Sequence, residues 1–147
     1  MLIHLTDQLQ TLESILLQGL VRPGQPFGAA YNVSSLAESQ AVCCFSEMSA
    51  LESVAALSER HGAYGLGFPK SWLQDRGAAP VWYLPRHSAV QTEVFNLIKR
   101  LAFETAPDPG HPLWRLTPFI DYPRESLPGQ AASTYDWRWE REWRVRG

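Results

Sequence analysis

Apolar residues recur at three- and four-residue spacing in three stretches of the chain, which is the period of an amphipathic helix. In "TDQLQTLESILLQGL" the apolar face is Leu9, Leu12, Ile15 and Leu16. Thr6 or Asp7 is expected to cap this helix, and Gly19 suits a left-handed C-cap. A second helix is predicted in "MSALESVAALSERHG". The clearest one is "HSAVQTEVFNLIKRLAFE", with a stripe formed by Val90, Val94, Leu97, Ile98 and Leu101.

Short apolar runs bounded by turn residues predict strands between these helices. They are "MLIHL", "AVCCFSE", "AYGLGF", "APVWYL" and "HPLWRLTPFIDYP". The stretch "PKSWLQDRGA" has room for a short helix, and residues 21–40 are expected to form a long irregular connection. Strands and helices alternate irregularly, which favours an α+β domain over a doubly wound parallel sheet.

The last stretch, "YDWRWEREWRVRG" (residues 135–147), predicts a final strand with two unlike faces. Side chains alternate across a strand with period two. One face would carry Trp137, Trp139, Arg141, Trp143 and Val145. The opposite face would carry Arg138, Glu140, Glu142, Arg144 and Arg146. The charged face is either a functional site or a salt-bridged surface.

Composition narrows the class of protein. With 147 residues and 45% apolar content, residues 1–147 are expected to form one domain around one core. The net charge of −2 gives no general attraction to nucleic acid or to anionic membranes. There is no signal-peptide pattern, no membrane-length apolar run and no metal-ligand spacing around Cys43 and Cys44. We therefore expect a cytoplasmic protein without a metal site.

Glu140 and Glu142 are the first candidates for chemistry. Two carboxylates on one strand face can orient a ribose hydroxyl and stabilise a cationic sugar transition state. The structural alternative is that Arg138 and Arg144 pair with them on the same face.

His4 and Thr6 form a second candidate group, because they would share a face of the first strand. The ring N–H of a histidine can hold a ribose hydroxyl or a carbonyl oxygen, but His4 could equally be a satisfied core residue. Ser46 lies where the "CCFSE" strand ends and is either a ligand-facing hydroxyl or a helix N-cap. Tyr64 lies in "YGLGF", where Gly65 and Gly67 leave room for a ligand, allow close strand packing or form a bulge.

The order of these motifs resembles a known family. "HLTDQLQTLESILLQGL" is similar to the opening of many ADP-ribosyltransferase-like domains. "CCFSEM", "HGAYGLGFPKSW", "PVWYL" and "EREWR" follow the order of elements in the AbiGi-like abortive-infection family of bacterial phage-defence proteins. The resemblance covers nearly the whole chain and implies mainly antiparallel split sheets, with flanking helices, around an NAD-binding cleft.

The resemblance also implies roles for individual residues. Glu142 would be the transferase glutamate and Glu140 would position the acceptor. His4, with Thr6 beside it, would hold the nicotinamide-side ribose, and Ser46 would stand on the second motif strand. In the superfamily such a histidine goes with a tyrosine on the next motif strand, for which Tyr64 is the candidate. The implied reaction is transfer of ADP-ribose from NAD to a macromolecular acceptor.

A different role is also implied, because AbiGi-like proteins are commonly described as the antitoxin half of a pair. The alternative hypothesis is therefore a non-catalytic module that binds a toxin partner. The aromatic residues near the C-terminus favour it, since Trp and Arg dominate binding hot spots. A third hypothesis is nucleic-acid binding through arginines 138, 141, 144 and 146, although they divide between two faces.

Overall fold

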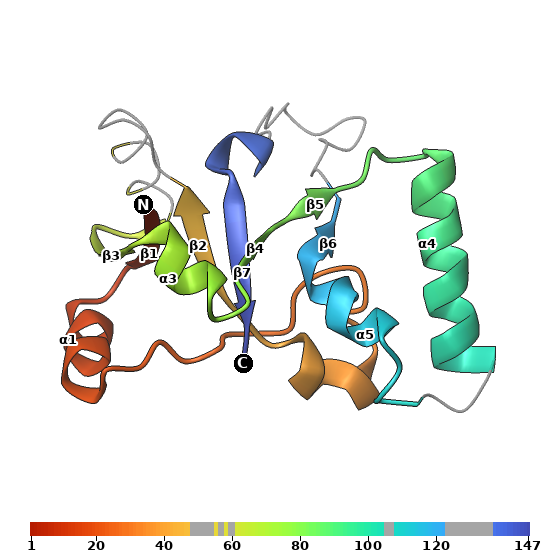
Figure 1. The fold of residues 1–147 in the computed structure, drawn as a ribbon, viewed down its shortest axis with the longest axis horizontal. Helices are drawn as coiled ribbons and strands as arrows, with labels where there is room; N and C mark the ends of the chain where they lie inside the picture. Colours follow the sequence, from red (N-terminus) through yellow and green to blue (C-terminus); the bar gives the residue numbers. More distant parts are fainter. Residues whose placement is uncertain (48–54, 56–57, 59–60, 105–107, 123–136) are drawn as a thin grey trace.

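A five-stranded antiparallel sheet, in the order β3-β1-β2-β7-β4, organises the computed structural model (Figure 1). The structure describes residues 1–47, 55, 58, 61–104, 108–122 and 137–147. The strands of the sheet are β1 (Leu2–Thr6), β2 (Val42–Glu47), β3 (Tyr64–Phe68), β4 (Ala79–Pro80) and β7 (Glu142–Arg146). This confirms the predicted α+β class and the antiparallel sheet.

One face of the sheet carries an apolar cluster, but Val42, Ser46 and Arg144 of the opposite face are buried as well, which the period-two pattern does not predict. Phe45 of β2 lies opposite Trp143 of β7, so their side chains share a face. Both belong to a cluster, called the sheet core, of Leu2, Cys43, Phe45, Leu73, Ala78 and Trp143. Leu73 comes from α3 (Lys70–Gln74), the short helix expected in "PKSWLQDRGA". The other predicted helix of this half is α1 (Leu9–Gln18), which ends at Gly19 in the expected left-handed conformation.

A second cluster, the helical core, lies away from the sheet. It is made of Ala29, Ala30, Val33, Leu36, Ile98, Ala102, Trp114 and Ile120. Residues 29–33 supply it together with η1 (Ser34–Gln40), α4 (Ala89–Lys99), η2 (Arg100–Glu104), α5 (Leu113–Leu116) and β6 (Ile120–Asp121). The short helix η3 (Thr117–Phe119) connects α5 to β6. Figure 1 shows α5 and β6 between the sheet and α4.

Buried hydrogen bonds connect η1 to α5 and η3 beside the helical core. Gln40 and Thr117 are both fully buried, and the Thr117 hydroxyl donates to the Gln40 side-chain oxygen at 2.7 Å. The Gln40 amide nitrogen donates to the Trp114 carbonyl at 3.1 Å. Buried amides need such partners, so these bonds fix how η1 meets α5 and η3.

The final strand is shorter than predicted. Trp137–Glu140 forms a 3-10 helix, η4, and only Glu142–Arg146 is extended. Arg141 between them has a positive φ of 46°, which breaks the period-two alternation. Glu140 and Glu142 therefore come from different elements, and the prediction that they share one strand face is wrong.

Three other predictions need correction. The stretch "HPLWRLTPFIDYP" is mostly helical, since α5 and η3 precede the two-residue strand β6. "APVWYL" supplies β4 to the main sheet and β5 (Trp82–Tyr83) to a separate parallel pair with β6. The N-cap of α1 is Gln8, because β1 continues through Thr6. Most of the helix predicted in "MSALESVAALSERHG" lies outside the described residues.

Candidate functional site

A cleft of about 570 Å³ lies where the main sheet meets the β5–β6 pair and residues 25–31. Its walls come from β1, β2 and β7 on one side, and from β5, β6 and the segment around Phe27 on the other. The volume is in the usual range for ligand sites in proteins. His4, Ser46, Glu140 and Glu142 all line it.

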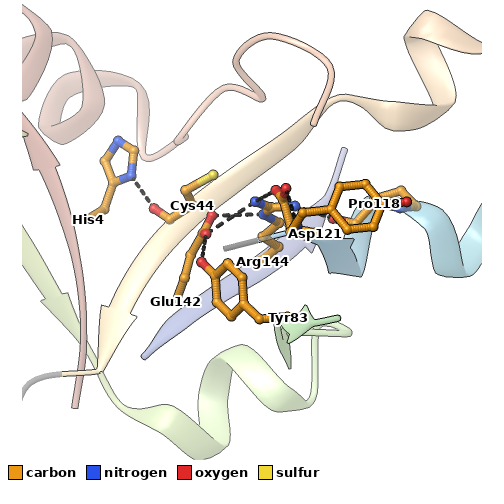
Figure 2. Close-up of polar contacts among 8 residues, drawn as sticks. His4, Cys44, Tyr83, Pro118, Asp121, Glu142 and Arg144 are labelled. Atoms are coloured by element: carbon orange, nitrogen blue, oxygen red, sulfur yellow. Dashed lines mark hydrogen bonds and ion pairs between the residues drawn. The ribbon is translucent and has the colours of Figure 1, made fainter. Parts of the chain in front are cut away.

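Glu142, at the start of β7, is held by its own chain (Figure 2). The Tyr83 hydroxyl donates to its Oε2 at 2.7 Å. Arg144 donates to Oε1 through Nε at 2.8 Å and to Oε2 through Nη2 at 3.1 Å. Both carboxylate oxygens are therefore hydrogen-bonded within the protein, and the predicted pairing of Arg144 with Glu142 is confirmed.

Arg144 is the centre of this cluster, with a side chain only 2% exposed. Besides Glu142, it binds the Asp121 carboxylate through Nη2 at 2.7 Å and the Pro118 carbonyl through Nη1 at 2.6 Å. A buried guanidinium is tolerated when its charge and its N–H groups are satisfied in this way. The arginine thus ties β7 of the main sheet to η3 and β6.

Burial controls the protonation of the groups beside Glu142. Desolvation raises the pKa of the Tyr83 phenol far above its usual value, and the Glu142 charge adds to the shift. The Cys44 thiol also has a strongly raised pKa, first because it is buried and then because it faces Glu142. Both groups are protonated at neutral pH, so Tyr83 is a hydrogen-bond donor and Cys44 is not a thiolate nucleophile.

Glu140 reaches the same cleft from η4. Its carboxylate lies 3.0 Å from Nε2 of His61, and its side chain is 5% exposed. The left-handed Arg141 turns the chain between the two glutamates. The structure thus brings Glu140 and Glu142 to one cleft, although not on one strand face.

His4 lies in β1, where β1 separates from β2. The paired residues of these strands are Leu2 with Glu47 and Ile3 with Ser46, after which Nδ1 of His4 makes a hydrogen bond of 2.9 Å with the Cys44 carbonyl. Since a carbonyl only accepts, Nδ1 carries the proton. Figure 2 shows His4 and Glu142 on opposite sides of Cys44.

Ser46 is placed at the cleft by the ladder of β2 with β7. It lies within β2 and opposite Glu142, and it is 7% exposed. The helix that Ser46 was expected to cap would follow Glu47, and residues 48–54 lie outside the described part of the chain.

Thr6 and Tyr64 do not line the cleft; they face each other at the far end of the β1–β3 ladder. The Thr6 hydroxyl accepts from the Gln8 amide at 3.4 Å. The register of β1 and β3 is continuous, which excludes a bulge at Gly65 or Gly67. A Cβ on Gly65 would lie 3.0 Å from the His4 carbonyl oxygen, so close strand packing favours glycine there, whereas a Cβ on Gly67 would meet only the flexible Met1 side chain.

Sequence reasoning missed Tyr83, Asp121 and Tyr122 as cleft residues. The sequence pattern predicts strands at Tyr83 and Asp121 but no function for them, and nothing in their local pattern indicates that β5 and β6 pair beside β7. A buried arginine is rare unless it is paired. The sequence does contain one signal for the buried cluster. Residues 135–147 hold four arginines although they are expected to form a half-buried strand, so at least one arginine should have acidic partners there.

Three other observations concern ligands and partners. Among the described residues, no group of three or more histidines, cysteines and carboxylates could hold a metal ion. Within the same residues, no helix is both long and apolar enough to cross a membrane. Arg144 is buried and Trp143 is 6% exposed, so neither is available to a nucleic acid, whereas Trp139 is 38% exposed.

The fold and the cleft define a small α+β domain with an antiparallel sheet and an internally paired acidic cluster. A family model described as "Putative abortive phage resistance protein AbiGi, antitoxin" matches residues 26–147. The chain therefore belongs to the AbiGi family, whose description names phage resistance and an antitoxin. No curated protein and no solved structure matches the chain. The ADP-ribosyltransferase-like core stays a prediction.

Proposed function

We propose that this chain acts in phage defence as an antitoxin-type protein, which binds a toxin partner through the cleft and carries out no reaction there. The family description supports the antitoxin role. The cleft offers a surface for such binding, since the exposed rings of Phe27 and Tyr31 line it together with Tyr83. Aromatic side chains are favoured at protein interfaces because they bury much apolar area.

The observation that carries the non-catalytic role is the state of Glu142. A transferase glutamate must direct an oxygen at the sugar cation that develops in the transition state. In this chain Arg144 and Tyr83 already bind both oxygens, and the side chain is 13% exposed. Such a carboxylate orders the cleft wall and has little capacity left for a substrate.

Co-expression tests this role. Candidate toxin genes from the adjacent genome region would be expressed with the wild-type chain and with Glu142→Gln. Growth is expected to recover with both, because glutamine keeps the size of Glu142 and one of its two acceptor oxygens. Turnover of NAD by the purified wild type that Glu142→Gln abolishes would overturn the non-catalytic role.

A second candidate function is NAD binding in the same cleft, with transfer of ADP-ribose as the reaction. The observation that favours it is that four of the residues predicted from the resemblance, His4, Ser46, Glu140 and Glu142, line one cleft. Their convergence from β1, β2, η4 and β7 was not required by their positions in the sequence.

Calorimetric titration with a non-hydrolysable NAD analogue tests the second candidate. If the cleft takes NAD, the wild type binds the analogue and Ser46→Val weakens binding at least tenfold. Thr11→Val is a suitable control, because Thr11 is exposed on α1 and does not line this cleft. Absence of binding at millimolar analogue would remove this function.

A further inference from the structure

Strand β3 (Tyr64–Phe68) forms one edge of the main sheet. It pairs with β1 on one side, and no other strand of the described residues pairs with it on the opposite side. Alternate residues of an edge strand direct their N–H and C=O groups away from the sheet, where another extended chain can bind them. A further strand can therefore be added at β3.

The residues of β3 do not protect this edge. Proteins commonly block an exposed edge with charged side chains, proline, a bulge or a very short strand. The sequence of β3 is Tyr-Gly-Leu-Gly-Phe, without charge or proline, and its register with β1 is continuous over five residues. Gly65 and Gly67 are exposed and have no side chain that would keep a second backbone at a distance. The strand itself therefore does not oppose pairing.

The order of residues in β3 is complementary to a second copy of the same strand. In an antiparallel pair centred on Leu66, this residue meets Leu66 of the second copy, and Tyr64 meets Phe68. Gly65 then lies opposite Gly67. Aromatic and aliphatic cross-strand pairs stabilise a sheet. A two-fold interface needs a surface that matches itself, and the nearly palindromic sequence of β3 has this property.

The charges around β3 also fit an uncharged partner strand. The nearest basic residues along the chain are His61 before the strand and Lys70 after it. His61 contacts the Glu140 carboxylate at 3.0 Å, and Lys70 contacts the Glu47 carboxylate at 2.8 Å. Like charges directly opposite each other destabilise a strand pair, and self-pairing of β3 brings none together.

Exposed leucines lie on the same side of the molecule as this edge. Figure 1 shows α1 and β3 on the side opposite α4, and the two elements are in contact. Leu9 and Leu16 of α1 are both exposed, and because they are seven residues apart they share a helix face. Leu17 is 88% exposed. These side chains offer apolar area that a pair of five-residue strands alone does not supply.

We propose that β3 is a self-association edge, through which two copies of this chain pair antiparallel about a two-fold axis at Leu66 and join their sheets into one. None of Tyr64–Phe68 lines the cleft, so the dimer does not use the cleft residues. The proposal is independent of the antitoxin function, because it concerns the chain alone. The small contact predicts a weak dimer with a dissociation constant in the micromolar range.

Sedimentation velocity of the purified chain from about 1 μM to about 300 μM tests the proposal. The wild type is expected to change from monomer to dimer over this range. Leu66→Lys is expected to weaken dimerisation at least tenfold, because two lysines would meet at the axis, and mixing it with Leu66→Glu should restore the dimer. Trp82→Lys, at an exposed position of β5, is the control and should dimerise like the wild type. A wild type that stays monomeric, or a Leu66→Lys variant that dimerises equally well, would overturn the proposal.

A cysteine variant tests the same pairing if the charged variants fail to fold. Opposite residues of a strand pair have Cβ atoms about 4.5–5.5 Å apart, close to the separation in a disulfide. Mild oxidation of Leu66→Cys should therefore give a covalent dimer, while Trp82→Cys stays mainly monomeric. Equal cross-linking of the two variants would contradict the pairing. A monomeric wild type whose growth rescue is abolished by Leu66→Lys would assign the edge to a strand of the toxin and would likewise overturn self-association.

Discussion

Arg144 shows how one residue can connect separate parts of this molecule. Its guanidinium group binds Glu142, Asp121 and the Pro118 carbonyl, so it connects neighbouring positions of β7 to β6 and η3. Replacing a buried arginine by an apolar residue leaves its carboxylate partners buried without compensation. The contribution of Arg144 is therefore inseparable from that of the acids around it.

We predict that Arg144→Met lowers the free energy of unfolding by about 3–5 kcal/mol. The control is Arg146→Met on the same strand, where the arginine is exposed and a change within about 0.5 kcal/mol is expected. Urea denaturation measures both. A loss below 1 kcal/mol for Arg144→Met would show that the cluster is not stabilising.

Glu47 makes the stability of the sheet depend on pH. Its carboxylate accepts from Lys70 at 2.8 Å and from the Trp143 indole at 2.9 Å. The bond from Lys70 is the main reason that the pKa of Glu47 lies below its ordinary value of 4.5. A group with a depressed folded pKa stabilises the fold above its unfolded pKa, and this contribution is lost as the pH falls through the folded pKa.

We therefore predict that Glu47→Gln destabilises the protein at pH 7 and that its difference from the wild type shrinks steadily below about pH 4.5. Thermal unfolding between pH 3 and pH 7 measures the effect, with Glu38→Gln at an exposed position as the control. A difference that stays constant over this range would mean that the ionised carboxylate is not the stabilising form.

At the scale of elements, the segment that contains Phe27 is held against η3 by a close backbone approach. Gly28 has a φ of 84°, and a Cβ there would lie 2.7 Å from the Cα of Pro118. The neighbouring Ala29 amide donates to the Thr117 carbonyl at 3.0 Å. This approach sets one wall of the cleft, because Phe27 and Gly28 line it.

Gly77 provides a matched control for this contact, since its φ is 83° and nothing lies within 4 Å of its would-be Cβ. Gly77→Ala is expected to cost about 1–2 kcal/mol from the left-handed backbone alone. Gly28→Ala should cost a further 1–3 kcal/mol, because the added methyl group collides with backbone. Equal losses in chemical denaturation would indicate that η3 moves away freely.

Elements with a long, regular pattern were predictable from the sequence, and those fixed by distant contacts were not. The stripe of α4 and the C-cap of α1 depend on local spacing and on one glycine. The prediction that residues 137–140 are extended is wrong, because the chain turns at Arg141, whose left-handed conformation the strand pattern does not indicate. The helix α5 lies where a strand was predicted, and there the Trp114 carbonyl accepts from Gln40, a residue far away in the sequence.

The candidate site was predictable only in part. Sequence motifs indicated His4, Ser46, Glu140 and Glu142 as candidates. The positions of Tyr83 and Tyr122 in the cleft depend on the β5–β6 pairing, which no local pattern indicates.

At the scale of the whole molecule, the sheet core and the helical core are joined by polar contacts. Arg144 spans them through Pro118 and Asp121, and the Gln40–Thr117 pair secures the helical side. Contacts of this kind depend strongly on orientation, so loosening one cluster should weaken the other. The two clusters are therefore expected to unfold together.

We predict that Thr117→Val lowers the free energy of unfolding by about 1–3 kcal/mol, because the Gln40 side-chain oxygen loses its donor while buried. Native-state hydrogen exchange should show equal losses of protection in α4 and in β2, since global unfolding exposes both. Thr92→Val, at an exposed position of α4, is the control. A loss confined to α4 would mean that the two clusters unfold separately.

The position of β7 has a consequence for synthesis of the protein. This strand follows all the other described strands along the chain, yet it lies inside the sheet, between β2 and β4. During synthesis β7 leaves the ribosome after β1 to β6. In the five-stranded sheet β4 therefore has no neighbouring strand to pair with until β7 emerges. The Pro118 carbonyl and the Asp121 carboxylate likewise lack their hydrogen bonds to the Arg144 guanidinium group until then. The cleft therefore forms only once β7 has left the exit tunnel.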